Sequence, residues 1–243
     1  LLQDRVRLRN IRKVLAVRAL VLFFGGLLFL SVWEADILHF YGVYIGAGLL
    51  LVTWPDKRLV MVFIISMIAF PALMAFINWE TGWDFATLSY QGLWSPEGFL
   101  RNTLFNGFHP FFPWFCFFVF GMLLGRRDFS DKEKLFSLFK SSAVIFLACE
   151  TIGIGIMMIF GKTEFYYLFS TLSFPPFPLF VISGCASACM IVIGCIVLAD
   201  YLPETWTLPF VYTGQMVLTH YITHVIIAMA LLESLGILYE QPL

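Results

Sequence analysis

The stretch NGFHPFFPWFCFFVFGMLLGRR, residues 106–127, decides the fold class. It opens on polar residues, passes two prolines, and then runs from Trp114 to Leu124 without a charged residue. It closes on a glycine and two arginines. A charge-free apolar run that starts at a proline and stops at basic residues is typical of a membrane span.

The composition of the whole chain agrees with this interpretation. Of its 243 residues, 60% are hydrophobic and 13% are charged, with a net charge of -1. A soluble domain of this length cannot bury so much apolar surface, so the lipid bilayer is the expected surroundings of the chain. The charge balance gives no reason to expect a nucleic-acid partner. We therefore predict an all-α integral membrane protein, a polytopic bundle of about seven transmembrane helices in one domain, residues 1–243.

Apolar runs divide the chain into seven expected spans. Their approximate bounds are residues 14–33, 37–54, 59–77, 109–125, 141–160, 177–198 and 209–232. Residues 1–13 are basic and are expected to form an amphipathic surface helix that leads into the first span. The longest connection, residues 78–108, is too polar to cross a membrane, and its aromatic content predicts an outer interfacial loop.

The distribution of basic residues sets the expected orientation. With seven alternating spans and residues 1–13 in the cytoplasm, all of the 15 Lys and Arg residues except Arg101 and Lys162 lie on the cytoplasmic side or just within the membrane there. An excess of Lys and Arg in cytoplasmic loops is the general rule for membrane proteins. We therefore expect a cytoplasmic N-terminus.

Two histidines at the outer side are candidates for chemistry. His109 follows a polar threshold at the mouth of the fourth span, where it is either a general base or an ordinary interfacial residue. Asp36 and His39 are three residues apart at the start of the second span, so they share a helix face. A carboxylate beside an imidazole fixes its tautomer and raises its basicity. Asp36 is alternatively a solvated residue that complements the helix dipole.

Other polar residues lie within the spans. Glu150 is expected near the middle of the fifth span, where an ionisable residue is a functional-site hypothesis. His220 and His224 are four apart and share a face, which suits a metal or haem pair. Because no third ligand accompanies them, polar packing is favoured and no metal is expected. The absence of GxSxG and of a phosphate-binding glycine loop argues against covalent serine chemistry and nucleotide hydrolysis.

Several segments resemble one family of membrane enzymes. SPEGFLRNTLFNGFHPFFPWFCFFVFGMLLGR, residues 95–126, is similar to a segment of the heparan-α-glucosaminide N-acetyltransferase-like proteins, D-P-E-G-L-L-x-T-L followed by a span that ends in G-x-x-x-G-R/K. ADILHFYGVYIG, residues 35–46, resembles the opening of one of their middle helices. GQMVLTHYITHVII, residues 214–227, resembles their final-helix pattern G-x-N-x-L-x-x-Y-x-x-H. The HPFFPW portion is closer to related bacterial membrane proteins of poorly defined function.

The resemblance implies a transmembrane acyltransferase of a bacterial inner membrane. Such an enzyme takes an acyl group from cytoplasmic acyl-CoA, for which acetyl-CoA is the expected co-substrate, and delivers it to an envelope glycan or lipid-linked sugar. His109, His39 and Asp36 would be catalytic. Residues expected to contact the acceptor are Glu97, Arg101, Asn106, Glu150 and His224. Arg126 and Arg127 would attract the acyl-CoA phosphates.

One departure from the family keeps an alternative open. Family members carry further N-terminal helices with an R-x-x-x-x-D-x-x-R-G opening and the expected catalytic histidine, and neither is present here. This predicts that the chain is the C-terminal portion of such a protein or a relative that has lost those helices, in which case His39 and His109 line a pocket. The alternative function is a non-catalytic helical subunit or transporter module that works with protein partners or with further copies of itself.

Overall fold

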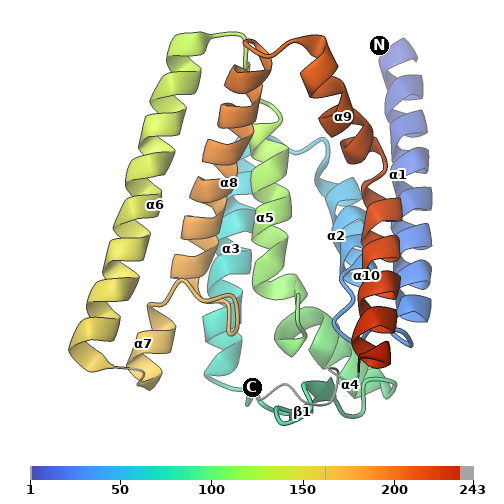
Figure 1. The fold of residues 1–243 in the computed structure, drawn as a ribbon, viewed down its shortest axis with the longest axis vertical. Helices are drawn as coiled ribbons and strands as arrows, with labels where there is room; N and C mark the ends of the chain where they lie inside the picture. The colour runs from blue at the N-terminus through green and yellow to red at the C-terminus, as the bar shows by residue number, and fades with distance from the viewer. Residues whose placement is uncertain (1, 162, 236–243) are drawn as a thin grey trace.

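Helices that run between two ends of the molecule make up most of the computed structural model, which describes residues 2–161 and 163–235 (Figure 1). The longer helices are α1 (Leu2–Phe29), α2 (Leu38–Leu51), α3 (Asp56–Met74), α5 (Phe111–Leu124), α6 (Lys132–Phe160), α8 (Pro178–Ala199), α9 (Glu204–Gln215) and α10 (Val217–Ser234). The short elements are β1 (Trp83–Asp84), β2 (Ser89–Tyr90), α4 (Pro96–Arg101), the π-helix η1 (Asn102–Asn106) and α7 (Glu164–Leu168). The all-α expectation is therefore confirmed.

Among the described residues, three to five helices or bent helix pairs are long and apolar enough to cross a membrane. The helices α3, α6 and α8 are long and apolar enough to cross a membrane. Two bent pairs raise the number to five if each pair counts as one span: α4 and η1 with α5, at 50°, and α9 with α10, at 72°. The helix α2 is apolar but has only 14 residues. The expected number of seven is therefore not confirmed, because length and charge exclude the first two helices.

Several helices differ in extent from the expected spans. A separate surface helix is expected over residues 1–13. In the structure, residues 2–13 are instead the first part of α1, which continues without a break to Phe29. The expected span 209–232 is divided between α9 and α10. The backbone departs from helical geometry at Met216, which lies between the two helices. The expected loop 78–108 carries the β1–β2 ribbon, in which Trp83 pairs with Tyr90, and then α4 and η1.

One end of the molecule gathers most of the basic residues and is called the basic end here. It comprises the start of α1, residues 52–58, residues 125–134 and residues 199–204 (Figure 1). Two ion pairs join these segments: Arg126 Nη1 lies 2.8 Å from Asp56 Oδ1, and Lys132 Nζ lies 3.0 Å from Asp200 Oδ2. The opposite end, called the loop end, comprises residues 30–37, 75–110 and 163–177.

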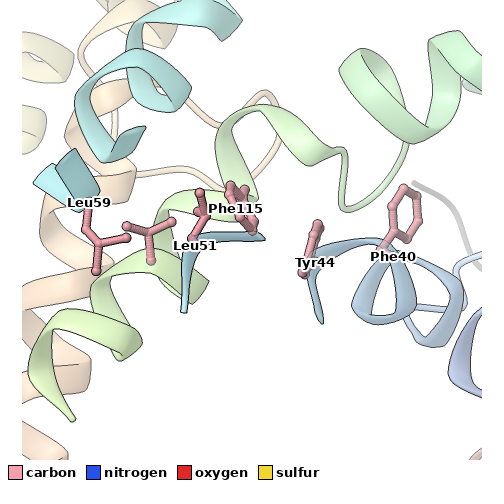
Figure 2. Close-up of a cluster of buried hydrophobic side chains, with 6 residues drawn as sticks. Phe40, Tyr44, Leu51, Leu59 and Phe115 are labelled. Carbon is pink, nitrogen blue, oxygen red and sulfur yellow. The ribbon is translucent and has the colours of Figure 1, made fainter. Parts of the chain in front are cut away.

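A cluster of buried side chains joins α2 to α5 and to the start of α3 (Figure 2). Phe40, Tyr44 and Leu51 come from α2. Leu59 on α3 and Phe115 on α5 pack against them, and each of these five side chains is at most 7% exposed. Lipid tails are as apolar as these side chains, so close van der Waals packing, rather than removal from water, holds the helices together here. The cluster therefore holds the first turn of α2 in a defined place at the loop end.

Candidate active site

The first turn of α2 carries the clearest chemical pair in the structure. Asp36 Oδ2 accepts a hydrogen bond from the backbone N–H of Leu38 at 2.9 Å and a longer one from that of His39 at 3.4 Å. The same oxygen lies 3.5 Å from Nδ1 of His39. Asp36 is fully buried and His39 is 1% exposed. The predicted pair thus exists. Its carboxylate also accepts hydrogen bonds from the first N–H groups of α2, as the alternative interpretation expects, but Asp36 is buried and not solvated, so that part of the alternative is wrong.

The arrangement leaves the far nitrogen of His39 available. If Nδ1 donates its proton to Asp36, Nε2 is the nitrogen that accepts a proton. Nε2 of His39 is buried and has no hydrogen-bond partner among the described residues. Because buried polar atoms are almost always paired in folded proteins, an unpaired ring nitrogen beside a buried carboxylate makes His39 a candidate site residue.

A glycine on α1 makes room for this pair. A Cβ atom added at Gly26 would lie 2.2 Å from the backbone nitrogen of His39 and 2.9 Å from Oδ2 of Asp36. Real side chains do not approach so closely, so only glycine permits α1 to pack against the turn. Gly42, further along α2, has the same role there, since an added Cβ would lie 2.6 Å from the backbone nitrogen of Phe23. Small residues allow this close helix packing in membranes.

Tyr221 on α10 completes the surroundings of Asp36. Its hydroxyl donates to Oδ1 of Asp36 at 2.9 Å and accepts a hydrogen bond from the backbone N–H of Ile37 at 3.3 Å. Both carboxylate oxygens of Asp36 are therefore engaged. The sequence pattern did not single out Tyr221 as a site residue, although it is the tyrosine of the final-helix pattern. Its distance of 185 residues from Asp36 along the chain hides this contact from the sequence.

His109 lies close to this pair, at the break between η1 and α5. Its backbone carbonyl accepts a hydrogen bond from the Tyr44 hydroxyl. The ring of Phe40 neighbours both histidines, and its centre lies 4.0 Å from that of His39 and 6.1 Å from that of His109. The ring of Trp114 packs edge-on against His109 at 4.7 Å. Nδ1 of His109 and Nε1 of Trp114 are also buried without partners among the described residues.

The predicted residue Asn106 holds the loop that lies over this end. Its amide nitrogen donates to the carbonyl oxygens of Trp79 at 2.7 Å and Thr81 at 2.8 Å. Its side-chain oxygen accepts from the Tyr90 hydroxyl at 2.8 Å, and its backbone oxygen accepts from Nε1 of Trp83 at 2.6 Å. Asn106 is fully buried. These bonds connect residues 79–90 to the end of η1, immediately before His109.

Arg101 and Glu97 lie on the outer side of the same loop. Arg101 Nε donates to the Tyr90 hydroxyl at 2.8 Å, and its guanidinium lies over the Tyr90 ring. Burial raises the pKa of Tyr90 above its ordinary value of 10, while Arg101 and Asn106 act in the opposite direction. The phenol is therefore uncharged near neutral pH. Glu97 is 89% exposed and lies 3.5 Å from Arg101, a weak pair in water.

Glu150 has a separate polar environment between α6 and α8. Its two carboxylate oxygens accept hydrogen bonds from the hydroxyls of Ser183 at 2.7 Å and Thr171 at 3.0 Å. In the described part of the chain neither a histidine nor Arg18 is bonded to it. The structure thus brings Asp36, His39 and His109 together, and it gives Glu150 different neighbours.

His224 and the two arginines lie elsewhere. His224 Nδ1 is 3.0 Å from the backbone oxygen of His220, and its ring packs edge-on against Tyr221 at 5.5 Å. Arg126 donates at 2.8 Å to Trp54 O and at 3.2 Å to Val52 O, in addition to its pair with Asp56. Arg127 is exposed at the basic end. Within residues 2–161 and 163–235 no group of three or more His, Cys, Asp or Glu residues could hold a metal ion.

Comparison with protein-family models gives one match. Residues 10–160 fit the family described as heparan-alpha-glucosaminide N-acetyltransferase, catalytic. The matched range contains Asp36, His39 and His109 and ends before α8, so Tyr221 lies outside it. Comparisons with curated proteins and with solved structures give no match.

Proposed function

Because the chain belongs to the heparan-alpha-glucosaminide N-acetyltransferase catalytic family, we propose that it is a membrane acyltransferase whose proton-accepting residue is His39. The single observation that carries this assignment is the buried Nε2 of His39, which lacks a partner in the described chain while Asp36 lies on the opposite side of the ring. The acyl donor is acetyl-CoA or a related acyl-CoA. The acceptor is an envelope sugar or a lipid-linked sugar.

The proposed reaction follows from this geometry. His39 Nε2 accepts a proton from the amine or hydroxyl of the acceptor, which attacks the thioester carbonyl of the acyl-CoA. The negative charge of Asp36 stabilises the imidazolium that forms. When the tetrahedral intermediate collapses, the bond from carbon to sulfur breaks. The imidazolium then returns the proton to the departing thiolate, so that His39 is neutral again.

Tyr221 and His109 support this step in different ways. Tyr221 holds Oδ1 of Asp36 and so leaves Oδ2 for the His39 ring. His109 and Trp114 have ring nitrogens without partners in the part of the chain that the structure describes, and His109 shares the neighbouring Phe40 ring with His39. We propose that one of them donates a hydrogen bond to the developing oxyanion, because such donors stabilise the transition state most strongly in a water-poor site.

An aromatic cluster at the loop end supports a sugar as the acceptor. Trp83 packs edge-on against Phe108 at 4.7 Å and against Phe174 at 5.5 Å. Trp79 also contacts Phe174, at 4.6 Å, and its Nε1 is buried without a partner among the described residues. Half-buried aromatic faces with a few polar atoms suit the apolar face and the hydroxyl groups of a sugar ring.

The donor side of the proposal rests on the basic end. Arg126 is engaged by the α2–α3 turn, so we propose that it shapes this end, whereas the exposed Arg127 meets the phosphates of the acyl-CoA. Glu97 and Arg101 are proposed to contact the acceptor at the outer edge of the loop, and Asn106 to hold that loop in place. For Glu150 and His224 a contact with the acceptor stays a prediction.

The test is transfer of a labelled acetyl group from acetyl-CoA to glucosamine-containing acceptors in proteoliposomes. His39→Gln keeps the size and polarity of the side chain but removes the base. We expect transfer to fall about 10²–10⁴-fold, the usual contribution of a general base. His220→Gln, on the exposed face of α10, serves as the matched control and should retain activity. Unchanged transfer in His39→Gln would contradict the assignment, and acetyl-CoA binding without any transfer would favour a non-catalytic subunit.

A further inference from the structure

A groove between α1 and α2 at the basic end has features of a ligand site that the proposed reaction does not use. It has a volume of about 640 Å³. Its described lining consists of Leu8, Arg9, Arg12, Lys13, Ala16, Leu49 and Leu50. Arg9, Arg12 and Lys13 lie within one turn of each other, with Arg9 three and four residues before the other two, so they share one face of α1.

The charge of this groove is not balanced by the described chain. The lining that the structure describes includes three cationic side chains and no acidic one. Arg126 and Lys132, also at the basic end, differ in this respect, because Arg126 pairs with Asp56 and Lys132 pairs with Asp200. Arg12 reaches the Thr53 hydroxyl at 3.5 Å, which is a neutral contact. The groove is therefore complementary to an anion with more than one oxygen.

The other walls of the groove are apolar and outward-facing. Leu50 is 73% exposed and Leu8 is 39% exposed, and Ala16 lies one helix turn further toward the centre of α1. A soluble phosphate would contact only the cations and would leave these apolar walls uncovered. An amphiphile satisfies both halves of the groove, with its phosphate on the cations and its hydrocarbon chain along the leucines.

We infer that this groove binds an anionic phospholipid. The phosphate and the headgroup lie against Arg9, Arg12 and Lys13. One acyl chain runs past Leu49 and Leu50 along the lipid-facing side of α1 and α2. The bound lipid thereby fills the groove at the basic end of α1 and α2, the two helices that carry Gly26 and His39 at their other ends. This inference does not depend on the proposed function.

The experiment compares two variants with equal charge change. The full chain is purified in a neutral detergent and supplied with phosphatidylglycerol or with phosphatidylcholine, and native mass spectrometry measures the bound lipid. The groove variant is Arg9→Gln, Arg12→Gln, Lys13→Gln. The matched control is Lys57→Gln, Arg58→Gln, Lys134→Gln, which removes three charges from the same end. We expect phosphatidylglycerol affinity to fall about tenfold or more in the groove variant and less than about twofold in the control.

A third variant separates a lipid from other anions. Leu49→Gln, Leu50→Gln should weaken phosphatidylglycerol binding and leave the binding of inorganic pyrophosphate unchanged. Equal losses in the two charge variants would show a diffuse charge effect and overturn the inference. Equal binding of phosphatidylcholine would overturn it as well. Displacement of the lipid by coenzyme A at equimolar concentration would assign the groove to the acyl donor instead.

Discussion

At the scale of single residues, the site depends on how Asp36 is held. Its two oxygens serve three partners: the first backbone N–H groups of α2, the His39 ring and the Tyr221 hydroxyl. A carboxylate with all of its oxygens engaged cannot rotate away from the imidazole. The hydrogen bond from α10 therefore fixes the position of the base on α2 without touching the base itself.

Tyr221→Phe tests this positioning role. The change removes a hydrogen bond to a charged group, and such bonds contribute about 1.5–3 kcal/mol. We expect kcat for acetyl transfer to fall about tenfold or more, while KM for the acceptor stays within about twofold. Steady-state kinetics in proteoliposomes measure the effects on kcat and on KM separately. Tyr212→Phe, on the exposed face of α9, is the control, and an equal loss there or a change in KM alone would contradict the role.

At the scale of the elements, the meeting of α1 and α2 places the pair. Gly26→Ala would put a methyl group 2.2 Å from the backbone nitrogen of His39, so one of the helices must move. We expect a loss of about 1–3 kcal/mol in unfolding free energy, the usual cost of overpacking, together with a loss of acetyl transfer. Gly25→Ala has no atom within 4 Å of its added Cβ and should be neutral or slightly stabilising.

Thermal unfolding in detergent and the transfer assay measure both effects. The two glycines are neighbours on one helix, so helix propensity is nearly the same for the pair. A similar outcome for the two variants would show that the close approach at Gly26 does not position the site.

The loop over the site is a second element with its own test. Asn106→Leu removes three side-chain hydrogen bonds and leaves the carbonyls of Trp79 and Thr81 and the Tyr90 hydroxyl without this partner. At about 0.5–1.5 kcal/mol each, this loosens the loop locally. Amide hydrogen exchange of residues 79–91 should become at least about tenfold faster, with α6 and α8 unaffected. Asn78→Leu, in the same loop, loses one exposed bond and should change exchange little.

At the scale of the whole molecule, Arg126 joins the end of α5 to the turn between α2 and α3. Arg126→Gln loses the pair with Asp56 and bonds to two carbonyls. Because its side chain is 30% exposed, solvent screens some of this contribution. We expect unfolding free energy to fall by about 1–2 kcal/mol.

Arg127→Gln should behave differently, with unchanged stability and a raised KM for acetyl-CoA. Differential scanning fluorimetry and steady-state kinetics, applied to both variants, distinguish the two arginines. A raised KM for acetyl-CoA without any loss of stability in Arg126→Gln would show that Arg126 contacts the acyl donor, as the sequence analysis expects.

The sequence predicted helices and contacts between residues that are neighbours along the chain. It did not predict contacts between segments that are far apart along the chain. Apolar runs predicted helices, and the short spacing of Asp36 and His39 predicted their contact, although Asp36 lies before the first residue of α2 and reaches His39 from the turn that leads into the helix. The contact of Tyr221 with Asp36, the bonds of Asn106 to residues 79–90, and the neighbours of Glu150 depend on how separate helices pack. Hydropathy also did not predict the bend between α9 and α10, since apolar residues continue on both sides of the bend.

The short length of α2 has a consequence for the membrane around the site. A helix of 14 residues covers about 21 Å, whereas a bilayer core is about 30 Å thick. A hydrophobic segment shorter than the bilayer core is accommodated by local thinning of the lipid. Asp36 and His39 lie at the loop-end start of this short helix and are buried within the protein. A bilayer that thins beside α2 would bring its two faces closer together at this pair than along the longer helices.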